Sequence, residues 1–153
     1  VTPHNPFKKI KEISSDEQRL KMVSKFCEKQ LNMVCSRVEF DLPKPNYTSE
    51  TLAYINQKNP NSNLYVILGE DNLNNLDKWK DYQKILGHQI CVYPRKNQTN
   101  VKSKLIDHKM IKLYKAPLKD ISSTLIRERI KNGISIKDLV PNVIYVEYKK
   151  FFK

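Results

Sequence analysis

The sequence predicts an α/β fold: a single domain over residues 1–153 with a mainly parallel sheet. Segments typical of strands alternate with segments typical of helices along the whole chain, and no internal repeat or linker interrupts them. The run Leu64-Tyr-Val-Ile-Leu68 is continuously apolar, as in a parallel strand that is buried on both faces. Hydrophobic residues make up 39% of the chain, which is enough to form a core at this length.

The N-terminal part of the chain predicts helices that flank one strand. Val1-Thr2-Pro3 is typical of the end of a strand, and a polar loop follows it. Ser14-Ser-Asp-Glu17 is a capping-box pattern, and apolar residues at helical spacing continue it: Leu20, Val23, Cys27 and Leu31. The alternation from Ser36 to Leu42 predicts a half-buried strand. After the prolines that end this strand, Thr48 and Ser49 are expected to cap a helix that runs to about Lys58.

The remaining elements continue the alternation of strands and helices. After the strand at Leu64–Leu68 we expect a helix around Trp79–Leu86, a strand at Gln89–Tyr93, a polar loop at Asn97–His108 and a strand at Met110–Ala116. A helix carrying Leu125, Ile126 and Ile130 should end at Asn132-Gly133. Pro141 suits the first turn of a last helix with Val143, Val146 and Phe151.

Polar and basic groups follow the predicted strands. In parallel sheets, ligands bind at the carboxyl ends of the strands. The groups at these ends are Asn5 with Lys8, Gly69 with Asp71, Arg95, and the segment Ser122–Arg127. This edge of the sheet therefore has the outline of a site for a phosphorylated ligand.

Three adjacent hydroxyl residues, Ser122, Ser123 and Thr124, lie where a strand leads into a helix N-terminus. Free backbone N–H groups and the positive end of the helix dipole favour a phosphate at such a place. Arg127 lies one turn further on and has the geometry to bind phosphate oxygens with two N–H groups. A hydroxyl N-cap followed by a solvated basic helix face explains the same pattern, and both interpretations stay open.

The chain is strongly basic, with 28 Lys and Arg against 16 Asp and Glu and a net charge of +12. Such a charge attracts polyanions, either nucleic acid or phosphorylated small molecules. The lysines are scattered and no nucleic-acid-binding motif accompanies them, so no nucleic-acid partner is expected. No apolar run is long enough to span a membrane, and we expect a soluble, cytoplasmic protein. The three cysteines, Cys27, Cys35 and Cys91, lack metal-site spacing, so no protein-held metal is expected.

The segment Ile121-Ser-Ser-Thr-Leu-Ile-Arg127 resembles the ISSTxIR motif of the nicotinate-nucleotide adenylyltransferases. Further motifs agree in order and spacing over the whole chain: Pro45-Asn-Tyr-Thr48 with Thr51-Leu52, Gly69-Glu-Asp71, Trp79, Tyr93-Pro-Arg95 and Leu139-Val-Pro141. The Asn-Pro-Phe-Lys loop and the Gly-Glu-Asp-Asn run look most like the Bacteroidetes branch. The resemblance implies a Rossmann-like nucleotidyl transferase domain.

The chain departs from the family pattern at its start. The family begins with a strand and a GxFxPxHxGH loop whose histidines hold the ATP phosphates, and this sequence contains neither. We therefore expect an N-terminally truncated chain, inactive and poorly stable by itself. Smaller departures are Lys8, where many members have His, and Lys96-Asn97, where many have Pro-Gly.

The resemblance implies an enzyme of NAD biosynthesis that transfers AMP from ATP to nicotinate mononucleotide, giving deamido-NAD and pyrophosphate, with Mg²⁺ accompanying ATP. The residues implied to be catalytic are Ser122, Ser123, Thr124 and Arg127. Those implied to bind ATP and ribose are Gly69, Asp71, Ile121, Ser122, Thr124 and Arg127. Those implied to bind nicotinate mononucleotide are Asn5, Lys8, Tyr47, Thr48, Trp79 and Arg95.

Each implied role has a structural alternative: Asp71 as a helix cap, Trp79 as a core residue, and Lys8, Arg95 and Asn5 as solvated surface. Three other functions also stay open. They are another transferase of the superfamily, such as the pantetheine-phosphate enzyme, a basic nucleic-acid-binding module, and a domain that binds nucleotide without turnover. Trp79 and Pro45-Asn-Tyr-Thr48 argue against the first. The chain is also expected to be a possible homo-oligomer.

Overall fold

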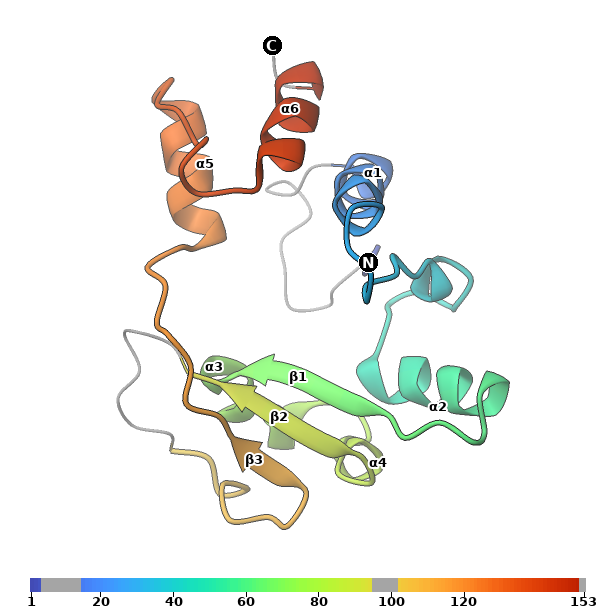
Figure 1. The fold of residues 1–153 in the computed structure, drawn as a ribbon. Coiled ribbons are helices and arrows are strands. Elements are labelled where there is room, and N and C mark those ends of the chain that lie inside the picture. Colours follow the sequence, from blue (N-terminus) through green and yellow to red (C-terminus); the bar gives the residue numbers. More distant parts are fainter. Residues whose placement is uncertain (4–14, 95–101, 152–153) are drawn as a thin grey trace. The chain divides into compact units, whose positions relative to one another are not determined.

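The computed structural model describes residues 1–3, 15–94 and 102–151 (Figure 1). The chain divides into two compact units. The first unit contains Val1–Asn46 and Ile121–Lys153, and the second contains Tyr47–Asp120. Unit 2 therefore lies within unit 1 in the sequence, and each unit is described by itself below.

Unit 2 is built on a three-stranded parallel sheet in the order β1-β2-β3. The strands are β1 (Tyr65–Gly69), β2 (Gln89–Tyr93) and β3 (Ile111–Leu113). In register, Val66 is opposite Ile90, and Ile90 is opposite Ile111. The prediction of a parallel sheet is confirmed, and helices join β1 to β2 as expected, although β3 is shorter than the run Met110–Ala116 suggested.

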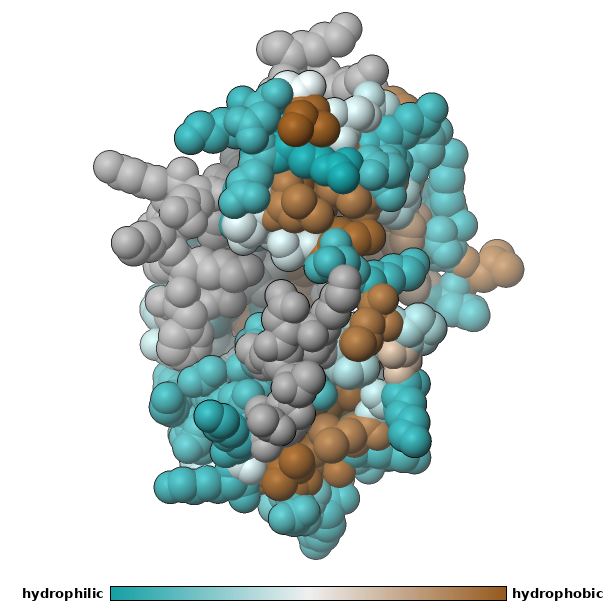
Figure 2. Space-filling view, turned by 90° about the vertical axis from the view of Figure 1, so that its left-hand side faces the viewer, coloured by the Kyte–Doolittle hydropathy of each residue, from teal (hydrophilic) through white to brown (hydrophobic). Residues whose placement is uncertain are grey.

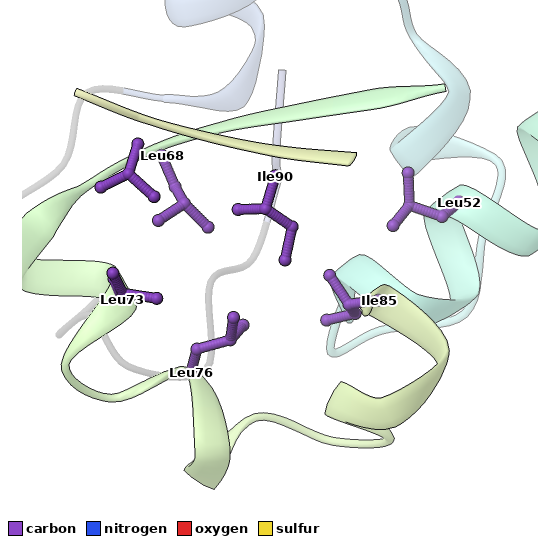
Figure 3. Packing of buried hydrophobic residues seen from close by; sticks show 7 residues of the cluster. Leu52, Leu68, Leu73, Leu76, Ile85 and Ile90 are labelled. Atoms are coloured by element: carbon purple, nitrogen blue, oxygen red, sulfur yellow. The ribbon is translucent and has the colours of Figure 1, made fainter. Parts of the chain in front are cut away.

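The hydrophobic core of unit 2 lies between one face of this sheet and short helices. These are α2 (Thr48–Lys58), α3 (Glu70–Leu73), the 3₁₀ helix η3 (Leu76–Lys78) and α4 (Tyr82–Ile85). Figure 3 shows Leu68 and Ile90 pointing from the strands toward Leu73, Leu76 and Ile85. The helical members of this group have no exposed surface, so they fix the distance between sheet and helices.

The opposite face of the sheet is open in the described part of the chain. Successive strand side chains point to opposite faces, and Tyr65 and Ile67 are 63% and 79% exposed while Leu68 is buried. The prediction that this strand is buried on both faces is therefore wrong for this structure. In Figure 2, hydrophobic surface is visible among hydrophilic surface on the face shown.

Unit 1 is helical where it is described. It contains α1 (Asp16–Cys27), the 3₁₀ helix η2 (Val38–Phe40), α5 (Ser123–Lys131) and α6 (Asn142–Phe151), and α1 packs against α6. Ser15 caps α1 in a capping box with Gln18, one residue later than Ser14 and Glu17 suggested. No helix among the described residues is long and apolar enough to cross a membrane.

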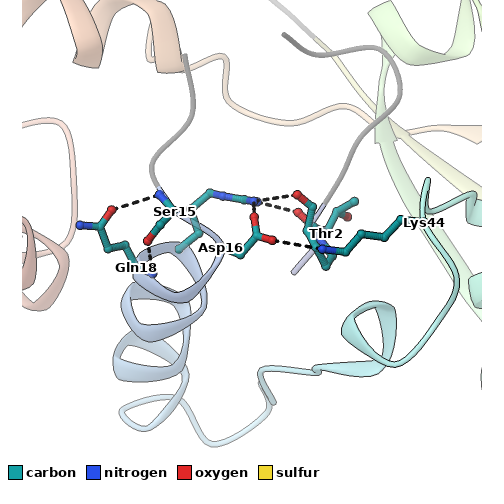
Figure 4. A network of polar contacts seen from close by, with 7 residues as sticks. Thr2, Ser15, Asp16, Gln18 and Lys44 are labelled. Atoms are coloured by element: carbon teal, nitrogen blue, oxygen red, sulfur yellow. Dashed lines mark hydrogen bonds and ion pairs between the residues drawn. The ribbon is translucent and has the colours of Figure 1, made fainter. Parts of the chain in front are cut away.

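Arg19 joins the start of α1 to the first residues of the chain. Its guanidinium donates to the carbonyls of Thr2 and Pro3, at 2.6 and 3.1 Å, and pairs with Asp16. Asp16 also pairs with Lys44, at 3.6 Å (Figure 4). Val1-Thr2-Pro3 form no strand; these bonds to Arg19 hold the segment instead.

Two further expectations for unit 1 are wrong. The first helix ends at Cys27, so Leu31 lies beyond it and is fully exposed. The segment Ser36–Leu42 forms no strand, because local bonds close it into a turn. The amide of Phe40 donates to the carbonyl of Arg37 at 2.8 Å, and the Ser36 hydroxyl accepts from the amide of Val38 at 3.2 Å.

Candidate active site

The first candidate group lies at the N-terminus of α5, in unit 1. Ser122 is the N-cap of this helix, and its hydroxyl accepts a hydrogen bond from the amide of Leu125 at 3.1 Å. The N-cap interpretation is thus right for Ser122. The amides of Ser123 and Thr124, one and two residues further on, have no carbonyl partner within the helix. Ile121 precedes the cap and is exposed.

Arg127 turns its guanidinium toward this same end of the helix. Its Nη2 donates to the Thr124 hydroxyl at 3.4 Å, and both side chains are exposed. Hydroxyls, free amides, a guanidinium and the positive end of the helix dipole therefore meet within one turn. Such a group suits the oxygen atoms of a phosphate.

Arg129 has a different set of partners. Its Nη1 donates to both carboxylate oxygens of Asp138, at 2.8 and 2.9 Å, and to the carbonyl of Ser135 at 3.1 Å. The hydrogen bond from Arg129 holds the pKa of Asp138 below its usual value of 3.8. Arg129 thus fixes the connection after α5, while Arg127 contributes to the candidate site.

The second candidate group lies in unit 2, where β1 leads into α3. Gly69 is the N-cap of α3 with φ −83° and ψ 160°, an extended conformation that does not require glycine. Asp71 lies in the first turn of α3 and is partly buried, so it is not the cap of this helix. Its backbone carbonyl accepts from the side-chain amide of Asn75 at 3.0 Å.

The N-terminus of α2 lies in the same unit. The prediction that Thr48 and Ser49 cap this helix is wrong, because Tyr47 is the N-cap and its side chain makes no capping bond. The carbonyl of Tyr47 accepts from the amides of Glu50 and Thr51, at 3.1 and 3.0 Å. The amides of Thr48 and Ser49 precede these bonds in the first turn, where helix amides favour an anion; Thr48 is partly exposed and Ser49 is buried.

Trp79 follows η3 in an extended conformation and precedes α4, which starts only at Tyr82. The helix expected at Trp79–Leu86 is therefore much shorter than predicted. The Trp79 side chain is partly buried and packs against the core of unit 2, so part of the indole is a core surface. The remaining exposed part is the surface on which a ring could stack.

Lys80 is a neighbour that the sequence did not single out. Its ammonium donates to Glu50 of α2 at 2.6 Å and lies 4.4 Å from the centre of the Tyr47 ring. The hydrogen bond to Glu50 raises the pKa of Lys80 above 10.5, against a smaller lowering by desolvation. The partners lie thirty positions apart in the chain, and no spacing in the sequence marks such a contact.

The structure groups the predicted site residues within each unit. Ser122, Ser123, Thr124 and Arg127 come together in unit 1, whereas Tyr47, Thr48, Gly69, Asp71 and Trp79 belong to unit 2. Asn5, Lys8 and Arg95 lie outside the described residues.

Comparison with known proteins first defines a class. Residues 1–129 match the model of the cytidylyltransferase-like family. The chain is 46% identical to the probable nicotinate-nucleotide adenylyltransferase of Flavobacterium psychrophilum, an alignment that covers 100% of this chain and 81% of the relative. The corresponding protein of Cytophaga hutchinsonii is 42% identical over 92% of this chain and 72% of the relative. The chain therefore belongs to the nicotinate-nucleotide adenylyltransferase family, a family of enzymes.

A solved structure has the same fold. It is the Plasmodium falciparum nicotinic acid mononucleotide adenylyltransferase complexed with NaAD, with a TM-score of 0.76 over 99% of this chain and 78% of that chain. Because the two sequences are 15% identical, this likeness shows the fold. The family and the Rossmann-like α/β fold expected from the sequence motifs are both confirmed.

Proposed function

We propose that the protein transfers the adenylyl group of ATP to nicotinate mononucleotide, giving deamido-NAD and pyrophosphate in NAD biosynthesis. The observation that carries this proposal is the 46% identity to a probable nicotinate-nucleotide adenylyltransferase over the whole chain. The anion-binding geometry at the N-terminus of α5 supports it.

In this reaction a phosphate oxygen of the mononucleotide attacks the α-phosphorus of ATP, and the bond from that phosphorus to the bridging oxygen of pyrophosphate breaks. No protein nucleophile is needed, so the protein acts by positioning the phosphates and stabilising their charge. Ser122, Ser123, Thr124 and Arg127 are the groups that we assign to the phosphates of ATP, with Ile121 beside them.

The groups of unit 2 are assigned to ribose and nicotinate mononucleotide. Asp71 offers carboxylate oxygens to ribose hydroxyls, and Gly69 precedes it at the end of β1. Tyr47 and Thr48 offer backbone amides to the nicotinate carboxylate, and Trp79 offers a ring for stacking. Asn5, Lys8 and Arg95, which lie outside the described residues, are proposed as further mononucleotide-binding residues.

Magnesium fits this arrangement as an ion that is held mainly by phosphates. Among the described residues, no three His, Cys, Asp or Glu side chains lie close enough to bind a metal together. Mg²⁺ in nucleotide enzymes is often held by substrate phosphates with one or two carboxylates. The ion would neutralise charge on the phosphates of ATP. The cytoplasmic location and the oligomeric state stay predictions.

Steady-state kinetics on the full-length natural protein test the proposed function. With ATP and Mg²⁺, kcat/KM should be higher for nicotinate mononucleotide than for nicotinamide mononucleotide. Two backbone N–H groups that bind the nicotinate carboxylate are not satisfied in the same way by the neutral carboxamide of nicotinamide. Equal kcat/KM values for the two mononucleotides would contradict the acid-specific assignment.

A further inference from the structure

Lys80 lies beside two residues of unit 2 that the proposed function places at the mononucleotide, Tyr47 and Trp79, and it pairs with Glu50. Its ammonium lies 2.6 Å from a carboxylate oxygen of Glu50 and 4.4 Å from the centre of the Tyr47 ring. In sequence it directly follows Trp79. One cation therefore contacts both the N-cap residue and an acidic first-turn residue of α2, next to the residue assigned to stacking.

Glu50 creates an electrostatic conflict at this helix end. An acidic residue in the first turn stabilises α2 through the helix dipole. The same negative charge repels any carboxylate that approaches the amides of Tyr47 and Thr48 at this helix end. A neutral amide would not experience this repulsion, so an unpaired Glu50 would favour nicotinamide over nicotinate.

The ammonium of Lys80 removes this conflict. Because it pairs with Glu50, the charges of these two side chains cancel, and the field of the helix amides stays attractive for an anion. The hydrogen bond to Glu50 also raises the pKa of Lys80 above 10.5. The two side chains are 47% and 39% exposed, so solvent screens the pair and its effect is modest.

We propose that Lys80 is a specificity-determining residue, which keeps the α2 N-terminus selective for a carboxylate by neutralising Glu50 and covering Tyr47. The inference rests on the proposed function, and it adds a positioning role for a residue that acts through Glu50 and Tyr47.

The test compares kcat/KM for nicotinate and nicotinamide mononucleotide in variants of the full-length protein. Lys80→Gln should lower the ratio of kcat/KM for nicotinate mononucleotide to kcat/KM for nicotinamide mononucleotide by roughly two- to fivefold, the range of an exposed charge pair. The kcat/KM for nicotinamide mononucleotide and the KM for ATP should stay unchanged. Lys80→Arg keeps the charge and should keep the ratio. The double variant Glu50→Gln/Lys80→Gln removes both charges and should restore the ratio toward that of the wild type.

Lys84→Gln is the matched control. Lys84 lies four positions further on and pairs with Asp81 at 2.9 Å, with no contact to α2 among the described interactions. This variant should leave the ratio unchanged, and the melting temperatures of all variants should show that they fold.

Three results with an active wild type would overturn the inference. The ratio of the two kcat/KM values could be unchanged in Lys80→Gln, kcat/KM could fall equally for both mononucleotides, or the double variant could fail to recover the ratio. A wild-type protein that adenylylates neither mononucleotide would instead overturn the proposed function, and the inference with it.

Discussion

Two arginines on α5, separated by one residue, have different partners and should have separable effects. Arg127 contacts Thr124 at the helix N-terminus, whereas Arg129 binds Asp138. If Arg127 holds ATP phosphates, Arg127→Lys keeps the charge but loses the planar fork. We expect a loss of up to about 1.5–3 kcal/mol in transition-state binding, the value of a hydrogen bond to a charged group.

Kinetics and thermal melts on both variants check this prediction. Arg129→Lys should lower the melting temperature only slightly, because solvent screens the partly exposed pair with Asp138, and should leave kcat/KM for ATP nearly unchanged. Equal kinetic losses from the two substitutions would mean that Arg127 is only surface charge.

Asp138 should make stability depend on acid pH. The bond from Arg129 lowers the pKa of Asp138 in the folded state below 3.8, its usual value. Its contribution to stability is therefore present above pH 3.8 and is lost as the pH falls through the lower folded value. Between about pH 7 and about pH 3, the melting temperature of the wild type should fall more than that of Asp138→Asn. Parallel curves for the two proteins would contradict the assignment.

At the scale of elements, the two faces of β1 should respond differently to truncation. Leu68 belongs to the core, whereas its neighbour Ile67 is 79% exposed. Leu68→Ala should destabilise the protein by about 2–5 kcal/mol, and Ile67→Ala should cost well under half as much because little surface is lost. Denaturant melts of the two variants measure the difference. A similar loss from both would show that the Ile67 face is covered in solution.

The elements also show what the sequence could predict. The bounds expected for β2 and the end expected for α2 are those of the structure, because their apolar residues pack into the core. The strand expected at Ser36–Leu42 does not form. Alternation of apolar and polar residues shows which side chains would share a face, but it does not supply a neighbouring strand to pair with, and local hydrogen bonds form a 3₁₀ helix instead.

The candidate site was predictable where a motif carries it and not elsewhere. The sequence predicts the site at the N-terminus of α5, because Ser122 is a typical N-cap residue and Arg127 lies one helical turn after the first hydroxyl residues. Lys80 does not, since its bond to Glu50 joins segments that only the folding of unit 2 brings together. Such long-range pairs leave no local trace in a single sequence.

For the whole molecule, the expectation of a single domain over residues 1–153 leads to a test of cooperativity. Trp79 is the only tryptophan of the chain and lies in unit 2, whereas α1, α5 and α6 belong to unit 1. If both units form one domain, Trp79 fluorescence and far-ultraviolet circular dichroism should report the same melting midpoint. Two separated transitions would mean that the units unfold independently.

The order of the two units along the chain has a consequence for biosynthesis. Unit 2 is one continuous segment, so a ribosome can complete it while the last helix is still unmade. Unit 1 takes α1 from the segment before unit 2 and α6 from the segment after it, so α1 must wait for its partner until unit 2 has been synthesised. Closing that long loop is entropically costly, but it is less so when the intervening residues have already compacted. The nascent chain should therefore acquire protease resistance at Tyr47–Asp120 before it does so at α1, which becomes resistant only after α6 has been synthesised.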